Sequence, residues 1–160
     1  MTADTRFQQL AQELGHDFNG EIKIGGNYTP VMRDGHRLYV SGQIPRVGDE
    51  VLFVGAVGDA LDLAQARQAA AICAMRALAF LQRTAGSLEA IASILRINVY
   101  VRCSPTFTQQ SEVADGASDV LCRVLGPRGV HARTSVGVLQ LPKGAAVELD
   151  LVATIAAAPM

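Results

Sequence analysis

Residues 62–84 read DLAQARQAAAICAMRALAFLQRT, and this segment decides the fold. Apolar side chains recur in it at the spacing of an α-helix. A helix so rich in alanine and so poor in charge is largely buried. We therefore predict a long core helix over residues 62–84, which Gly86 ends. Its apolar stripe consists of Leu63, Ala66, Ala70, Cys73, Ala77 and Phe80, broadened by Ala71, Leu78 and Leu81.

Two further segments have the pattern of amphipathic helices. Residues 3–14 place four apolar side chains on one face, with Thr2 or Asp4 as the candidate N-cap and Gly15 as the stop. Residues 108–125 do the same with the inward side chains Val113, Ala117, Val120, Leu121 and Val124. No repeat or long linker divides the chain, so we expect a single domain over residues 1–160.

Strands are predicted on both sides of the long helix. The segment ILRINVYV is rich in branched apolar residues, which favour extended backbone. Together with the other β-rich segments it predicts a sheet of about six strands. The expected strands are Glu21–Ile24, Arg37–Ser41, Val51–Val54, Ile94–Val101, Ala132–Leu139 and Ala145–Ile155, the last two joined by a turn at Pro142–Gly144.

These elements predict an α+β fold with one uncovered sheet face. A helix covers a strip only ~10 Å wide, so two main helices cannot cover both faces of such a sheet. We expect both on one face, with the N-terminal helix in addition. A homo-oligomer is the economical way to cover the other face.

Composition excludes several classes of protein. Hydrophobic residues make up 49% of the 160 residues and charged residues 18%, which is inconsistent with a disordered chain. A net charge of -1, with no Lys/Arg block and few aromatics, makes nucleic acid an unexpected partner. No apolar run has spanning length, and the N-terminus lacks a signal-peptide core, so we expect a cytoplasmic protein without a membrane partner.

Cysteine and histidine usage indicates neither disulfides nor a metal. The three cysteines, Cys73, Cys103 and Cys122, form no close pair, and we expect buried or half-buried free thiols. The histidines lack metal-ligand spacing, and His131 is expected to be a solvated residue at a strand edge. We predict no cofactor.

The most informative polar residue is Arg133. His131, Arg133 and Ser135 alternate and so share one face of a strand. No acid lies within four positions, but Glu148 and Asp150 on the following strand are expected nearby. Arg133 is then either half of an inter-strand ion pair or a two-pronged site for a small carboxylate, with an acid beside it to hold water.

A second polar group precedes the long helix. Tyr28 and the run Ser41-Gly42-Gln43 combine polar side chains with a glycine that lets a ligand approach closely. An ordinary turn has the same pattern, so this segment alone decides nothing.

Taken together, these residues resemble the reactive intermediate deaminase family (RidA/YjgF), also called endoribonuclease L-PSP. The resemblance runs from about residue 25 to the end, which makes residues 1–20 an N-terminal helical extension outside the family core. The matching positions are Tyr28, Ser41-Gly42-Gln43-Ile44-Pro45, Asn98, Ala132-Arg133, Leu141-Pro142 and Val147-Glu148-Leu149.

The resemblance implies a chorismate-mutase-like fold and a homotrimer with sites in the clefts between subunits. It implies that Arg133 binds the substrate carboxylate and that Glu148 positions the hydrolytic water. Pocket-lining roles are implied for Tyr28, Ser41, Gly42 and Asn98. The family's deaminases commonly carry cysteine two residues after the arginine, where this chain has Ser135, which leaves substrate preference open.

The implied activity is hydrolysis of 2-imino acids, or their enamines, to 2-oxo acids and ammonia, with no metal required. The alternative is a protein that binds a small carboxylate in the same pocket without chemistry. Ribonuclease activity, suggested by the family's other name, is disfavoured by the near-neutral charge and the scarcity of aromatic residues.

Overall fold

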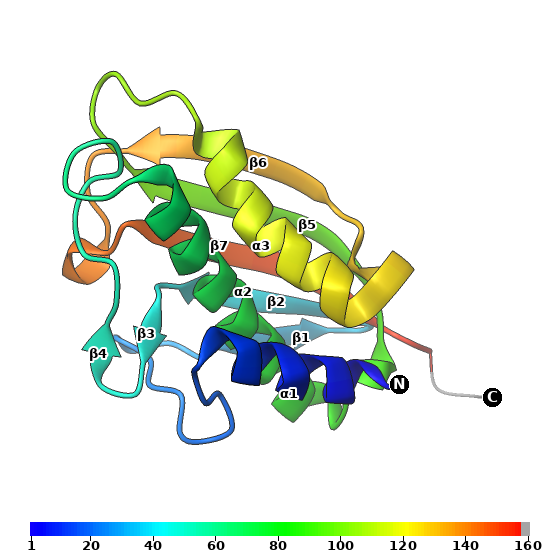
Figure 1. The fold of residues 1–160 in the computed structure, drawn as a ribbon. Helices are drawn as coiled ribbons and strands as arrows, with labels where there is room; N and C mark the ends of the chain where they lie inside the picture. The colour runs from blue at the N-terminus through cyan, green and yellow to red at the C-terminus, as the bar shows by residue number, and fades with distance from the viewer. Residues whose placement is uncertain (158–160) are drawn as a thin grey trace.

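The structure is a computed structural model that describes residues 1–157. These residues form two layers, with three α-helices packed on one face of a five-stranded mixed sheet (Figure 1). The strand order is β1-β2-β7-β5-β6, with β5 and β6 parallel and the other pairs antiparallel. The helices are α1 (Ala3–Leu14), α2 (Leu63–Ala85) and α3 (Gln110–Leu125), and the strands are β1 (Val31–Asp34), β2 (Arg37–Gln43), β5 (Ile91–Arg102), β6 (Ala132–Val138) and β7 (Val147–Ile155).

The α+β prediction is confirmed, and the strand predictions need correction. Glu21–Ile24 forms no strand. Val51 pairs only within a separate hairpin of β3 (Arg46–Val47) and β4 (Glu50–Val51). The sequence prediction missed β1, because Met32 and its two successors in that strand are exposed and leave no apolar alternation to detect. Gly42 lies within β2 and not in the loop that follows it.

The long helix forms where its sequence predicts it. Asp62 and Gln65 make a reciprocal capping box at its start, and Gly86 ends it in a left-handed conformation with φ 87°. Alanine keeps the helix thin, so α3 approaches closely. A Cβ on Gly116 of α3 would lie 2.2 Å from the carbonyl oxygen of Arg67, so only glycine fits at this crossing. The five inward residues predicted for α3 are all buried.

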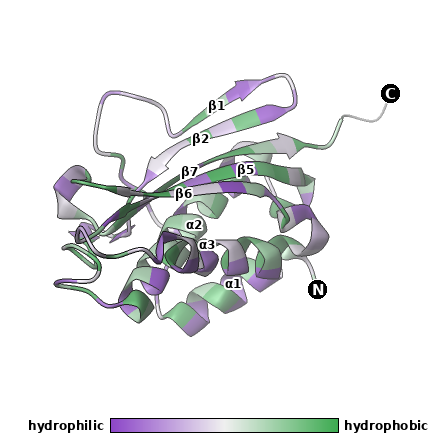
Figure 2. Cartoon of the chain, turned by 90° about the horizontal axis from the view of Figure 1, so that it is seen from above, coloured by the Kyte–Doolittle hydropathy of each residue, from purple (hydrophilic) through white to green (hydrophobic). Residues whose placement is uncertain are grey.

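The two faces of the sheet differ in chemistry. On the helix side, β5 and β7 present only apolar residues, including Ile97, Val99 and Leu149. The opposite face carries the polar side chains Asn98, Tyr100, Glu148 and Asp150, and no helix in residues 1–157 covers it (Figure 2). Tyr39 on this face is 42% exposed and Val136 41%. The expectation of an uncovered face is therefore confirmed, as far as residues 1–157 go.

The thiols are free, as expected. Cys73 is buried and Cys103 is half-buried. Cys122 is exposed, which corrects the expectation that all three would be at least half-buried. It lies on the outward side of α3, between buried residues such as Leu121 and Val124 that face the core.

The N-terminal helix is fastened to the end of α2 through Asp4. Thr2 is the N-cap, accepting a bond from Thr5, while Asp4 turns toward the protein. Its carboxylate accepts bonds from Gln82 Nε2 (2.6 Å), Ser87 Oγ (2.5 Å) and the Leu88 amide (3.0 Å). Burial alone would raise the pKa of Asp4, but these three donors outweigh it and lower the pKa.

We therefore expect Asp4→Ala to lower the free energy of unfolding by about 1.5–3 kcal/mol, the range for a hydrogen bond to a charged group. Because the folded-state pKa is depressed, the stabilisation is present above the unfolded pKa and is lost as pH falls through the folded one. Urea unfolding at pH 7 and pH 3 measures both effects. Asp59→Ala, at an exposed position, is the control, and an equal effect of both changes at pH 7 would contradict the role of Asp4.

Candidate functional site

A cleft of about 290 Å³ opens at one end of the sheet. It lies where the end of β2, the β3–β4 hairpin and the turn η3 (Pro142–Gly144) come together (Figure 1). The predicted residues Tyr28, Gly42 and Glu148 all line it. The remaining lining residues are Lys23, Ile24, Gly25, Gln43, Ile44, Arg46, Arg76, Pro142 and Lys143.

Glu148 and Gly42 depend on each other. A Cβ on residue 42 would lie 2.1 Å from Glu148 Oε1, so glycine is required to leave room for the carboxyl group. Glycine at position 42 thus admits a protein side chain, in addition to any ligand. Burial, and then the charge of Asp150, raise the pKa of Glu148. No ion pair within residues 1–157 opposes this shift. Such a carboxyl group is suited to proton exchange.

A buried arginine, Arg76, also lines the cleft, and the sequence analysis did not predict a role for it. Arg76 is 4% exposed and Gln43 2%, and Arg76 Nε donates to Gln43 Oε1 at 3.1 Å. Its terminal nitrogens donate to the carbonyls of Arg46 (2.7 Å) and Lys23 (2.8 Å). Burial lowers the pKa of Arg76 to about 10, which leaves it charged at neutral pH. An arginine inside an otherwise apolar helix was the available signal.

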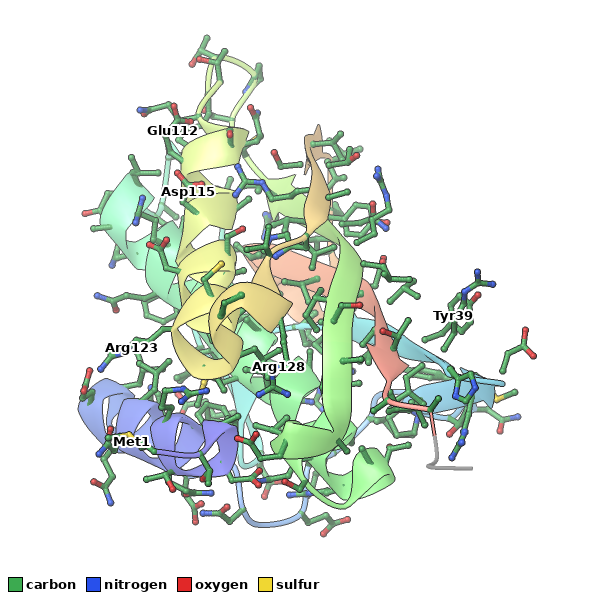
Figure 3. All side chains as sticks on the ribbon, turned by 90° about the vertical axis from the view of Figure 1, so that its right-hand side faces the viewer. Met1, Tyr39, Glu112, Asp115, Arg123 and Arg128 are labelled. Carbon is green, nitrogen blue, oxygen red and sulfur yellow. The ribbon has the colours of Figure 1, made fainter. Side chains whose placement is uncertain are left out.

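Arg133 occupies a different environment, against α3. Its Nη1 donates to Asp115 Oδ1 (2.8 Å) and Ser118 Oγ (3.0 Å), and its Nη2 to the carbonyl (3.1 Å) and hydroxyl (2.8 Å) oxygens of Ser111. Asp115 lies on α3, on the far side of the sheet from Tyr39 (Figure 3). The four terminal N–H donors of the guanidinium therefore have protein acceptors, and Nε–H remains.

The expectation that Glu148 and Asp150 lie near Arg133 is wrong within one chain, and so is the alternative of an ion pair between Arg133 and the following strand. Strand β5 lies between β6 and β7, so the two strands that follow one another in sequence are not neighbours. Arg133 is opposite Ile97 of β5, which faces the helices, while Glu148 is opposite Tyr100, which faces the other way. The acid that pairs with Arg133 is Asp115, which lies 18 positions upstream in helix α3.

His131 is also not the solvated residue that was expected. Its Nε2 lies 2.8 Å from Ser118 Oγ, and its Nδ1 contacts the carbonyl oxygen of Gly129. A carbonyl can only accept, so Nδ1 carries a proton, and in the neutral imidazole Nε2 accepts from Ser118. Ser118 in turn accepts from Arg133, which links the arginine, the hydroxyl and the imidazole in one chain of hydrogen bonds.

The remaining predicted residues are divided between the two sides of the sheet. Ser135 is half-buried on the helix side of β6, opposite Val99 and two residues from Arg133. Asn98 lies on the other face, and its amide donates to Asp150 at 2.8 Å, with Tyr100 donating to the same carboxylate at 3.0 Å. Ser41 donates to the carbonyl of Thr29 at 2.8 Å, which holds the segment that carries Tyr28. Neither Ser41 nor Asn98 lines the cleft within one chain.

Comparison with known proteins gives the family. The family model described as "YjgF/chorismate mutase-like, putative endoribonuclease" matches residues 14–154. The chain belongs to the YjgF family.

Individual relatives agree with this assignment. Protein TCP17 of Trypanosoma cruzi is 38% identical over 151 residues, covering 94% of each chain. The protein Atu1372 of Agrobacterium tumefaciens is 34% identical, with a TM-score of 0.84 over 96% of this chain and 92% of that one. TdcF of E. coli, solved with bound serine, shares the fold at 17% identity, with a TM-score of 0.62 over 88% and 97% of the two chains. Helix α1 lies largely outside the region that the family model matches.

Residues 1–157 contain no group of three or more His, Cys, Asp or Glu side chains arranged to hold a metal ion. None of the helices in this range is long and apolar enough to cross a bilayer.

The raised pKa of Glu148 predicts a pH-dependent stability effect. The unfolded state loses its proton first as pH rises, so Glu148 lowers stability between the unfolded and folded pKa values and stays unfavourable above both. We expect Glu148→Gln to raise the melting temperature at pH 7 relative to the parent. The gain should shrink below the ordinary glutamate pKa of about 4.3. Thermal scans from pH 3 to pH 8 test this, with Glu50→Gln, at an exposed position, as the control. A gain that is independent of pH would contradict the burial argument.

Proposed function

We propose that the protein hydrolyses 2-imino acids, or their enamine tautomers, to 2-oxo acids and ammonia. Water adds to the imine carbon, the C–N bond of the resulting tetrahedral adduct breaks, and ammonia leaves as the carbonyl forms. The imine carbon is already electrophilic, so the protein has mainly to orient the substrate and a water. Glu148 takes a proton from the water and returns one to the leaving nitrogen.

The single observation that supports this function best is the position of Glu148. Its carboxyl group lines a cleft of small-molecule size, has a raised pKa, and has room only because residue 42 is glycine. A carboxyl group that ionises closer to neutrality than usual is a better proton carrier than an ordinary glutamate.

Arg133 joins this site in the proposal through a second copy of the chain. Within one chain it lies on the opposite face from Glu148, on the edge strand β6. An edge strand and an uncovered sheet face both favour association, and in the proposed homotrimer the β6 edge of one subunit lies at the cleft of the next. Asp115 then fixes the guanidinium, and the substrate carboxylate accepts a hydrogen bond from Nε–H. A two-pronged contact between the carboxylate and the guanidinium requires one of the α3 acceptors to move away from a terminal nitrogen.

We expect a trimer by light scattering at micromolar concentration, with a mass near three times 16.9 kDa. Val136→Glu and Tyr39→Glu place a charge on the uncovered face and should produce smaller species without loss of secondary structure. A parent protein that is monomeric and folded, or variants that remain trimeric, would contradict the proposed assembly.

Substitution of Arg133 tests the carboxylate-binding role. Arg133→Lys keeps the charge but loses the planar fork, and a tilted substrate should be hydrolysed about 100-fold more slowly. Arg133→Ala should weaken 2-oxo acid binding by about 1.5–3 kcal/mol. Imines generated by an amino-acid oxidase and trapped with semicarbazide provide the rate. Arg123→Lys, an exposed residue of α3, is the control.

The melting temperature and the oligomer mass must match the parent for these rates to be compared. If Arg133→Ala is a folded trimer that deaminates at the parent rate, Arg133 is only a tether between β6 and α3.

The second candidate function is binding of a small carboxylate without chemistry. The observation that favours it is the saturation of the Arg133 terminal donors by α3, which keeps the guanidinium from gripping a substrate tightly. TdcF, which shares the fold, was solved with serine, a molecule that carries a carboxylate. Binding of 2-oxo acids without any acceleration of imine hydrolysis would select this candidate.

A further inference from the structure

The cleft that holds Glu148 is strongly cationic. Its lining includes Lys23, Arg46, Arg76 and Lys143, against Glu148 as the single acid. Lys23 is paired with Asp49, and three of the Arg76 donors are used by Gln43 and two carbonyls. Arg46 and Lys143 have no side-chain partner among residues 1–157. Two cations are thus left for a ligand.

Of these two cations, Arg46 gives the stronger evidence for a ligand. Its Nε is buried without a hydrogen-bond partner, and no other buried side-chain nitrogen or oxygen in the described part of the chain is left so. Burying an unpaired polar atom is destabilising, and more so when the atom belongs to a charged group. The backbone carbonyl of Arg46 accepts from Arg76 Nη1 at 2.7 Å, which fixes the two guanidinium-bearing residues beside each other. An anion bound here would offset the cost of the unpaired donor and reduce the repulsion between the two positive charges.

Lys143 forms another part of the cleft lining. It has φ 60° and ψ 16°, the left-handed conformation that non-glycine residues seldom adopt. Strained residues of this kind concentrate at binding sites, where the surrounding structure enforces them. Here the strain sits in the turn η3, directly before the strand that carries Glu148, so the lysine and the acid are presented to the same cleft.

We propose that this cleft binds a second anionic group of the ligand, and that the substrate class is therefore the 2-imino acids with a side-chain carboxylate. This assignment rests on the proposed function for the reacting end, where Glu148 faces the imine carbon. The distal carboxylate binds the Arg46 guanidinium and Lys143 Nζ in charge-assisted hydrogen bonds. A volume of about 290 Å³, near the low end for small-molecule sites, suits a ligand of this size.

Calorimetric titration of the full-length protein with two 2-oxo acids tests the assignment. We expect 2-oxoglutarate, with two carboxylates, to bind at least about tenfold more tightly than 2-oxobutanoate, the scale of one charge-assisted hydrogen bond. Arg46→Met should remove most of this preference by weakening the binding of 2-oxoglutarate. Lys143→Met should reduce it less, because Lys143 is exposed. Arg37→Met, at an exposed position of β2, is the control.

Inorganic phosphate serves as the competing anion. Equal affinity for the two acids in the parent, no binding of either, or phosphate binding more tightly than 2-oxoglutarate would overturn the assignment. Arg46→Met should also raise the melting temperature, because it removes an unpaired buried donor, and this separates ligand loss from unfolding.

The two proposals fail in different ways. If selective dicarboxylate binding is observed without imine hydrolysis, the proposed function fails and the anion site stands. Hydrolysis of imines with no preference for a second carboxylate would refute the anion site alone.

Discussion

The hydrogen bonds from Arg76 to the carbonyls of Lys23 and Arg46 are the constraint on which the cleft depends. Residues between α1 and β1 form no regular secondary structure, so their backbone groups need partners elsewhere. Helix α2 supplies these partners through two arginines, Arg76 and Arg83, which lie about two helical turns apart. Arg83 donates to the carbonyls of Phe18 and Gly20. The most buried helix of the protein thus also positions the segment that carries Tyr28.

This arrangement explains why a charged residue is tolerated in an alanine-rich core helix. A buried guanidinium is costly unless its donors are used, and here three bonds from Arg76 are made to fixed oxygens. Arg76 therefore has little capacity left for a ligand. Arg46, which lies at the end of one of those bonds, keeps its own donors for the cleft.

The sequence predicts the elements well and the contacts between them poorly, for a physical reason. Periodicity and capping act over a few residues, so α2, with Asp62 and Gly86 at its ends, is found almost to the residue. The partner of Arg133 depends on strand order, and the insertion of β5 between β6 and β7 is a property of the whole sheet. Strand β1 was missed for a different reason: it forms through pairing with β2 and has no buried side chain that would give a sequence pattern.

Local pattern accounts for part of the placement of Glu148. Alternation with the buried Val147 and Leu149 puts Glu148 on the polar face of its strand. That it fills the space above Gly42 could not be predicted, because the bulge between Val40 and Gln43 sets which residue of β2 faces it. The sequence around Gly42 looks the same whether the glycine leaves room for a ligand or for the carboxylate of another residue of the protein.

The saturated state of Arg133 bears on how a reaction at this site could turn over. A second prong, in which a substrate oxygen replaces the Asp115 carboxylate at Nη1, exchanges one charge-assisted bond for another of similar strength, so it adds little to the contact with Nε–H. Substrate and transition state share the carboxylate that Arg133 binds, and a contact that is equally strong in both does not stabilise the transition state selectively, so Arg133 contributes to the rate by orienting the substrate. Discrimination between ligands must then come from contacts remote from the imine. In this chain the unpaired donor on Arg46 is the group placed to supply it.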